Sequence, residues 1–308
     1  MAQTGRETSI GNGWQPLRWL EEDKFPEPQK CIILNAAPGG TIAREQNPHL
    51  PIKPEAIVQN HVEAYKVGAS MVHVHVRDER GHPTADPELY KRVILEIKET
   101  CPDIIIDCCF SRPHLEDSVE ARLEPICNLD LPIEIGTVSG GTFNTIGKGI
   151  YVNREDYLKS AVKYLQERKI RPAITLYNVK QIEDMKRWAM KSGVVKRPYL
   201  NLSLGLFGDP ARRDVLQTWL RYIPEECDWI AETAGRNWLP TTIEAILSGG
   251  HVRTGMEDSI YMYPHKDNLI KNSAEVVTKV RRIVEEVGRE IATPNEAREI
   301  LGLGDYWR

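Results

Sequence analysis

Eight short β-type runs alternate with longer helical patterns along this chain, and this alternation restricts the fold more than any other feature of the sequence. The runs are mostly apolar, as expected for strands that are buried on both faces of a parallel sheet. Eight is the number of parallel strands, each followed by a helix, that closes a barrel. The runs cover residues 31–37, 71–76, 103–109, 131–138, 171–177, 199–206, 227–234 and 249–256.

The segments between the runs have helical spacing and capping signals. Pro54 stands at a first-turn position of one such segment, and Asp86 and Pro87 open the next. We therefore predict an α/β fold, a (β/α)8 TIM barrel that forms a single domain over residues 30–308. A polar N-terminal arm, residues 1–29, precedes it. A loop and a capped helix near the C-terminus form a helical extension that covers the barrel or a partner subunit.

An open doubly wound sheet is the alternative fold. Such a sheet usually has a Gly-rich phosphate-binding turn directly after its first strand. The first run is followed by APGGT at residues 37–41, which is Gly-rich but does not match GxGxxG. The sequence therefore favours the closed barrel.

Composition and charge exclude several classes of partner. The net charge is −4 and no block of Lys and Arg stands out, which argues against nucleic acid. No segment approaches the ~18 apolar residues of a membrane span, and the N-terminal segment lacks the apolar core of a signal peptide. The six cysteines are scattered without a CxxC pair, as in reduced intracellular proteins. We expect a cytoplasmic protein without a nucleic-acid or membrane partner.

Two histidines, His73 and His75, lie two residues apart in the second β-type run. Residues i and i+2 of a strand point to the same face, so the two imidazoles project together. Strands two and eight both flank strand one in a closed barrel, and Glu257 follows the eighth run. We predict that these three side chains hold a divalent metal and leave one coordination position open, as in catalytic zinc sites. Mn, Co and Ni accept the same ligands, and two core histidines bonded to the backbone are the alternative.

Three motifs together resemble the β-keto acid cleavage enzymes. They are HVHVRDERGHPTADPELY at residues 73–90, NPHLP at 47–51, and GGHVRTGMED at 249–258. The similarity extends from about Cys31 to about Leu303. It implies an oligomeric TIM barrel with one zinc bound by two histidines and a glutamate. It also implies that a β-keto acid and acetyl-CoA, the co-substrate, give acetoacetate and a new acyl-CoA, so we expect these small molecules as partners and a homodimer or homotetramer.

The resemblance also suggests roles for individual residues. Asp258 resembles the family's general base, and Arg253 resembles the cation that offsets charge on oxyanion intermediates. Alone, Arg253 would be interpreted as a strand-end ion pair and Asp258 as a turn residue. Thr142 falls where the family has a threonine that helps to hold the substrate carboxylate, and Asn144 shares its loop. The residues support this chemistry, because a metal that chelates a β-keto acid stabilises the enolate formed by loss of a C2 proton.

Three positions depart from the family pattern. Thr41 lies near the place of a glutamate that receives the ammonium group of an aminohexanoate substrate, and Thr175 belongs to a fifth strand without the usual base-orienting glutamate. Cys109 lies where a carboxylate-binding serine is expected, with Ser111 as a substitute. Arg112 adds a cation that a second substrate carboxylate, or a surface position, would explain. Because an ammonium group without a counter-charge is costly to bury, we predict a neutral or anionic β-keto acid.

Three other functions remain open from the sequence. A metal-dependent C–C lyase of the aldolase type would use the same enolate chemistry without CoA. Zinc hydrolases on this barrel usually have histidines at strands five and six, whereas residues 171–177 and 199–206 have none. A metal-binding scaffold without catalysis would not need an acid and a cation beside an open coordination position.

Overall fold

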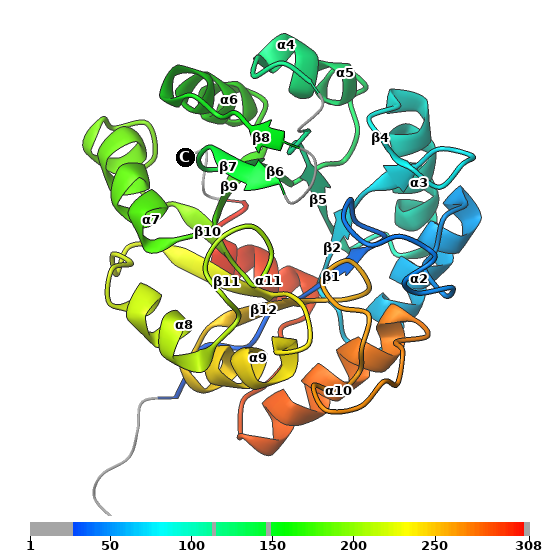
Figure 1. The fold of residues 1–308 in the computed structure, drawn as a ribbon. Helices are drawn as coiled ribbons and strands as arrows, with labels where there is room; N and C mark the ends of the chain where they lie inside the picture. The colour runs from blue at the N-terminus through cyan, green and yellow to red at the C-terminus, as the bar shows by residue number, and fades with distance from the viewer. Residues whose placement is uncertain (1–26, 113–114, 146–148, 305–308) are drawn as a thin grey trace, which may run out of the picture.

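A closed barrel of eight parallel strands forms the centre of the computed structural model, which describes residues 27–112, 115–145 and 149–304 (Figure 1). The prediction of a TIM barrel is confirmed, and each barrel strand overlaps one of the eight runs. The strands lie in the order β1-β12-β11-β10-β9-β6-β5-β2, so the strands that carry His73 and Arg253 both pair with β1. Their bounds are β1 (Ile33–Ala37), β2 (Met71–Val74), β5 (Ile105–Cys109), β6 (Ile135–Ser139), β9 (Arg171–Leu176), β10 (Tyr199–Leu204), β11 (Asp228–Thr233) and β12 (His251–Thr254).

Helices surround the barrel, and two short hairpins lie outside its sheet (Figure 1). The helices are α2 (Pro54–Lys66), α3 (Pro87–Thr100), α4 (Val119–Arg122), α5 (Glu124–Cys127), α6 (Glu155–Glu167), α7 (Val179–Met185), η1 (Lys186–Lys191), α8 (Arg213–Leu220), α9 (Trp238–Leu247), α10 (Ser273–Glu286) and α11 (Pro294–Leu301). The hairpins pair β3 (Val76–Arg77) with β4 (Pro83–Thr84), and β7 (Phe143–Thr145) with β8 (Gly149–Tyr151). None of the helices in the described residues has the length and the apolar run that crossing a membrane requires.

The C-terminal helix α11 packs against the apolar lower layer of the barrel interior, which confirms that the extension covers the barrel. Thr293 and Glu296 form a capping box that starts the helix. Leu301 belongs to the same buried cluster as Leu34, Met71 and other inward-facing strand residues. The predicted N-terminal arm lies almost entirely outside the described residues, as do residues 305–308.

The interior of the barrel changes from apolar to polar along the strands. Its lower layer contains Ile105 and Ile135, whereas Asp107 and Thr137, two residues further along the same strands, form part of a buried polar layer. Inward-facing residues recur at every second position of a strand, so the interior changes from apolar to polar between two consecutive inward-facing residues. A buried polar layer at the carboxyl ends of barrel strands is where TIM-barrel enzymes have their active sites.

His251 lies at the opposite end of β12 and links pH to stability. Its Nδ1 accepts a hydrogen bond from the backbone N–H of Ile32 at 3.2 Å, and burial, with the nearby charge of Arg289, lowers its pKa to about 3. In the unfolded chain its pKa is about 6.5, so below that pH only the unfolded state binds the proton. This residue should therefore cost about 1.4 kcal/mol of stability for each pH unit between about 6 and 4.

The substitution His251→Gln tests this linkage, because the amide oxygen can accept the same hydrogen bond but does not titrate. Urea unfolding of both proteins at a series of pH values gives the comparison. We expect the wild type to lose stability more steeply than the variant as the pH falls. Parallel curves would show that His251 is not held neutral in the fold.

Candidate active site

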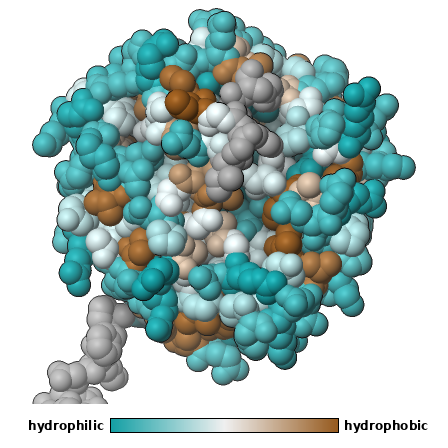
Figure 2. Space-filling view, in the orientation of Figure 1, coloured by the Kyte–Doolittle hydropathy of each residue, from teal (hydrophilic) through white to brown (hydrophobic). Residues whose placement is uncertain are grey.

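A cavity of about 420 Å³ opens at the polar end of the barrel. In the space-filling view, hydrophilic residues dominate the rim, and paler or brown residues gather toward the centre (Figure 2). Strand residues from around the barrel line it, including His73, Thr137, Thr175, Glu232 and Arg253. The cavity therefore lies over the buried polar layer, where side chains from several strands converge.

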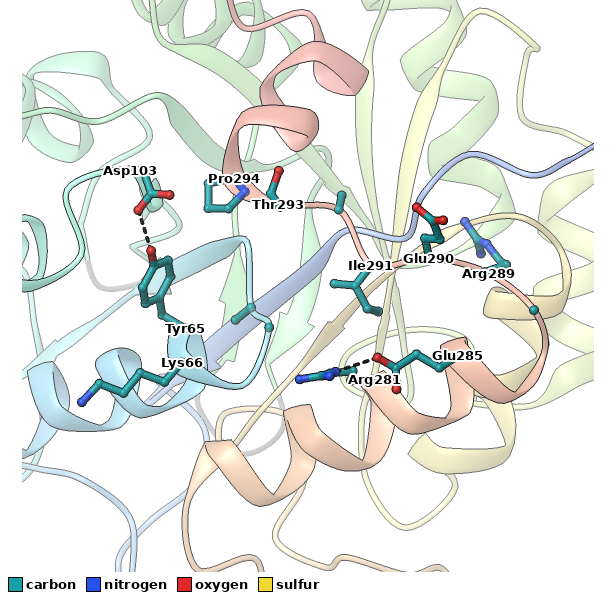
Figure 3. Close-up of a pocket in the computed structure, with 14 residues that line it drawn as sticks. Tyr65, Lys66, Asp103, Arg281, Glu285, Arg289, Glu290, Ile291, Thr293 and Pro294 are labelled. Carbon is teal, nitrogen blue, oxygen red and sulfur yellow. Dashed lines mark hydrogen bonds and ion pairs between the residues drawn. The ribbon is translucent and has the colours of Figure 1, made fainter.

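A larger cavity of about 710 Å³ lies at the other end, between α2, α10 and the segment that leads into α11 (Figure 3). Its acidic and polar groups already have partners, as Tyr65 donates a hydrogen bond to Asp103 at 2.8 Å and Arg281 pairs with Glu285 at 2.8 Å. It lies at the amino ends of the strands, where conserved residues in such barrels serve stability. The smaller cavity is the better candidate for chemistry.

His73 is oriented by a buried carboxylate that the sequence reasoning did not single out. Its Nδ1 lies 2.7 Å from an oxygen of Asp107, and the hydroxyl of Thr137 donates to the other oxygen of Asp107 at 2.7 Å. Burial lowers the pKa of His73, but the charges of Asp107 and Glu257 and the hydrogen bond to Asp107 together outweigh it and raise the pKa to about 9. A carboxylate bonded to one imidazole nitrogen, leaving the other free, is the usual support of a metal-binding histidine.

Glu257 meets the histidine pair across the end of β1. Its Oε1 lies 3.2 Å from Nε2 of His75, and its Oε2 is buried without a hydrogen-bond partner among the described residues. The loop after β1 passes so close that a Cβ on Gly39 would lie 2.1 Å from Cγ of Glu257. Gly39 also has a φ of +68°, so glycine is required there for two independent reasons.

Arg77 holds this loop in place. Its guanidinium donates to the carbonyl of Gly39 at 2.6 Å and to that of Ile42 at 2.7 Å. Arg77 thus braces the mouth of the barrel through backbone carbonyls.

Arg253 connects three carboxylates. Its Nε and Nη2 contact the two oxygens of Asp258 at 3.1 and 2.9 Å, Nη2 lies 2.7 Å from Glu257, and Nη1 lies 3.5 Å from Glu232. Burial, together with the charges of Glu232 and Glu257, raises the pKa of Asp258 to about 7 against the opposing charge of Arg253. The structure therefore brings together Arg253, Asp258, Glu257 and the two histidines.

The charges and the donor set of this site fit a divalent metal. The nearby carboxylates, Asp107 for His73 and Glu257 for His75, raise the pKa of each imidazole, so the site favours positive charge, and one divalent cation would take the place of the two protons. The unpartnered Oε2 of Glu257 and the nitrogens of His73 and His75 are donors of the kind that zinc prefers.

Glu232 is a site residue that the sequence reasoning missed. It lies on β11, is 3% exposed, and accepts hydrogen bonds from Asn201 at 2.6 Å and Ser203 at 2.9 Å. The available signal was a glutamate close to the carboxyl end of a β-type run, a position predicted to be buried, since a fully buried acid is rare unless it has partners. Asp107 gave the same signal on β5.

The remaining predicted substrate residues divide into two groups. Thr41, Cys109 and Ser111 line the cavity, with Ser111 bonded to Ser139 at 2.8 Å. Thr142, Asn144 and Arg112 do not line it.

Each residue of the second group has a different environment. The hydroxyl of Thr142 accepts from the backbone N–H of Asn153 at 2.8 Å, and Asn144 is exposed on β7. Arg112 is buried rather than on the surface, with its guanidinium 4.7 Å from the ring centre of Tyr90 and a hydrogen bond to the carbonyl of Cys109. A second substrate carboxylate at Arg112 is therefore not supported by the geometry.

Aromatic rings form the wall of the cavity that the strand-end acids do not occupy. Phe143 stacks on Phe207 at 5.0 Å between ring centres and lies 4.2 Å from Tyr177, while Tyr151 meets Phe143 edge-on at 5.2 Å. These rings pack on one another, so they present one apolar surface rather than a cage around an empty centre. We call these four residues the aromatic wall.

A buried cluster of acids, histidines and one arginine at the mouth of a TIM barrel is the arrangement of an enzyme. The chain matches the family model described as beta-keto acid cleavage enzyme over residues 30–303, and it belongs to that family. The resemblance stated from its motifs is thus confirmed.

Relatives with known activities cover almost the same span. The 3-keto-5-aminohexanoate cleavage enzyme of Fusobacterium nucleatum is 37% identical over 277 residues, which are 89% of this chain and 98% of the relative. The 3,5-dioxohexanoate:acetyl-CoA acetone transferase of Paraburkholderia graminis is 28% identical and covers 89% of this chain and 96% of its own. The solved structure of ObcA with a C4-CoA adduct and oxalate has a TM-score of 0.67 at 18% identity, over 83% of this chain and 68% of that one, and it supports the fold.

Proposed function

We propose that this protein transfers the acetyl group of acetyl-CoA to a β-keto acid with an uncharged side group, giving acetoacetate and a new acyl-CoA. The family and the acetyl-CoA-dependent relative support the reaction. The observation that carries the choice of substrate is the aromatic wall, which stands opposite the cluster of Arg253, Glu257 and the histidines.

We assign His73, His75 and Glu257 as the residues that hold a divalent metal, with zinc as the expected ion. When bound, such a metal would polarise the keto oxygen and the carboxylate of the substrate and so stabilise the enolate. Asp107 fixes the ring of His73 for this purpose, and Gly39 leaves the space that Glu257 needs.

In the proposed reaction Asp258 accepts the proton from C2 of the β-keto acid. C2 then forms a bond with the acetyl carbonyl carbon, and CoA thiolate leaves. The thiolate attacks the original ketone, the bond between C2 and that carbon breaks, and Asp258 returns its proton to C2. Arg253 holds Asp258 and offsets negative charge that develops on oxygen.

The charge of the cavity argues for a neutral side group. Among the described residues that line it, the charged ones are the two histidines, Glu232, Arg253 and Glu257, and all of them interact with one another or with strand residues. Thr41 offers no charge to an ammonium group at the mouth. The relative from Paraburkholderia graminis is named for 3,5-dioxohexanoate, a substrate whose side group is likewise neutral.

Three β-keto acids of equal length, with a methyl, an ammonium or a carboxylate group at the far end, test this proposal with acetyl-labelled acetyl-CoA. Label should appear in acetoacetate with the neutral acid, and kcat/KM for the ammonium analogue should be about 100-fold lower, because burying an unpaired cation costs several kcal/mol. Similar turnover of the neutral and ammonium acids would contradict the proposed preference for an uncharged side group. Cleavage without acetyl-CoA would instead indicate a lyase, and hydrolysis with water as acceptor a hydrolase.

A further inference from the structure

We propose that the sulfur of Cys109 is a direct ligand of the metal in the resting enzyme, so that four protein side chains hold it. The inference rests on the metal site proposed above and adds a ligand to it. One ligand atom from each of His73, His75 and Cys109 lies within 4.8 Å of the others. These three residues are the only group of three or more His, Cys, Asp or Glu residues with such spacing in the described part of the chain.

The spacing is close to that of a coordinated site. Metal–sulfur and metal–nitrogen bonds of about 2.3 and 2.0 Å at tetrahedral angles put ligand atoms about 3.5 Å apart. Atoms no more than 4.8 Å apart therefore need only side-chain rotations to close on an ion. Glu257 lies outside this group of three, but its Oε1 lies 3.2 Å from Nε2 of His75, so a further side-chain rotation would let it complete the set of four.

The strand register directs Cys109 into the site. Val74 on β2 is the partner of Cys108 on β5, so His75 and Cys109 are the next residues along these neighbouring strands. Successive side chains of a strand point to opposite faces. Cys108 accordingly packs in the core between strands and helices, whereas Cys109 lines the cavity.

The surroundings of Cys109 leave its sulfur available. Its contact with the carbonyl of Ser111, at 3.9 Å, is weak, and its other hydrogen-bonding partners are the two imidazoles of His73 and His75. The guanidinium of Arg112 donates to the backbone carbonyl of Cys109 at 2.9 Å, and no acidic partner of Arg112 is found among the described residues. A buried cation beside the residue favours a sulfur that carries negative charge, as a metal ligand does.

A sulfur ligand has consequences for the metal. Thiolate is a soft donor, so it favours zinc or cobalt over manganese or magnesium. It would also close the coordination sphere at rest. The first substrate oxygen would then enter by expansion to five ligands, which zinc tolerates, and a second would enter by displacing one protein ligand. A serine at this position would neither favour a soft metal nor close the coordination sphere at rest.

Cobalt substitution tests the ligand directly, because a thiolate bound to Co²⁺ gives an intense charge-transfer absorption in the near ultraviolet. The metal-free wild type, Cys109→Ala and Cys108→Ala are each given one equivalent of Co²⁺. Cys108 is the matched control, since it is the adjacent cysteine of the same strand and is fully buried away from the cavity. We expect the band in the wild type and in Cys108→Ala, and its loss in Cys109→Ala.

Zinc affinity gives a second measurement, with Cys109→Ser as an additional variant that keeps a polar side chain. Removing a residue that only hydrogen-bonds a metal ligand already weakens metal binding by about tenfold or more. Removing a direct ligand should therefore weaken zinc binding by at least about tenfold. Bound Co²⁺ without the band in the wild type, the band retained in Cys109→Ala, or its loss in both alanine variants would overturn the inference and leave the proposed function intact. A wild type that binds no metal would instead contradict the metal site of the proposed function.

Discussion

Asp258→Asn is expected to lower kcat for acetyl transfer by about 10²- to 10⁴-fold, the contribution of a well-placed general base. Asparagine has nearly the same shape and can still hydrogen-bond Arg253, but it cannot accept the C2 proton. Asp258 is buried against Arg253 at 2.9 Å, so the variant removes one proton acceptor and little packing. The effect should therefore appear in catalysis rather than in folding.

Exchange of the C2 protons of the β-keto acid with deuterated water isolates this step, since it needs no acetyl-CoA. Wild type should accelerate exchange above the uncatalysed rate, and Asp258→Asn should not. Glu232→Gln is the comparison variant, because Glu232 is the other buried carboxylate near Arg253 that is not a proposed metal ligand. It should slow exchange less than Asp258→Asn does, because Glu232 reaches Asp258 only through Arg253. If Glu232→Gln abolished exchange and Asp258→Asn retained it, the base would be Glu232.

We propose that Glu232 takes the place of the glutamate that the fifth strand lacks. The resemblance to the family implies a base-orienting glutamate there, whereas β9 presents Thr175, which accepts a hydrogen bond from Asn201 at 3.2 Å. Asn201 in turn donates to Glu232, and Glu232 pairs with Arg253 on the neighbouring strand. A carboxylate two strands away thus reaches the same arginine that holds Asp258. The sequence indicated that a carboxylate is absent at Thr175 but not that Glu232 could replace it, because these two positions come close together only in the closed barrel.

The barrel itself was predictable because its strands are nearly continuous apolar runs of regular spacing. The convergence of His75 and Glu257 was predictable for a related reason, since a closed barrel of eight strands fixes strands two and eight on either side of strand one. The direction of side chains at the strand ends could not be predicted from the sequence. Thr142 and Arg112 both follow a strand near the mouth, but their side chains bond to backbone and neighbouring rings outside the cavity.

The aromatic wall was also beyond prediction. Phe143 and Tyr151 come from the β7–β8 hairpin, and Tyr177 and Phe207 follow two different barrel strands. Nothing in their spacing along the chain indicates that they meet. They come together because each lies just past or beside the carboxyl end of a strand, and these ends surround one opening. The oligomeric state and the cellular location stay predictions from the sequence.

Removal of a proposed metal ligand should have the largest effect on the enzyme. Wild type is expected to contain about one divalent ion per chain by elemental analysis, and His75→Ala and Glu257→Gln should lose both the ion and acetyl transfer. Glu257→Gln is the sharper variant, because it keeps the shape beside Gly39 and removes a charge. His251→Gln serves as the histidine control, since it lies at the other end of the barrel and should retain the ion.

The loss of metal should also change stability in an informative direction. The metal binds the folded site and not the unfolded chain, so the metal-free wild type should unfold at a lower temperature than the loaded one. Glu257→Gln removes one proposed ligand, so its stability should depend much less on added zinc. A metal-free wild type that refuses added zinc, with unchanged unfolding temperature, would mean that His73 and His75 are core residues. The enolate chemistry proposed for Asp258 would then have no stabilising cation other than Arg253, and Arg253 is already shared among three carboxylates.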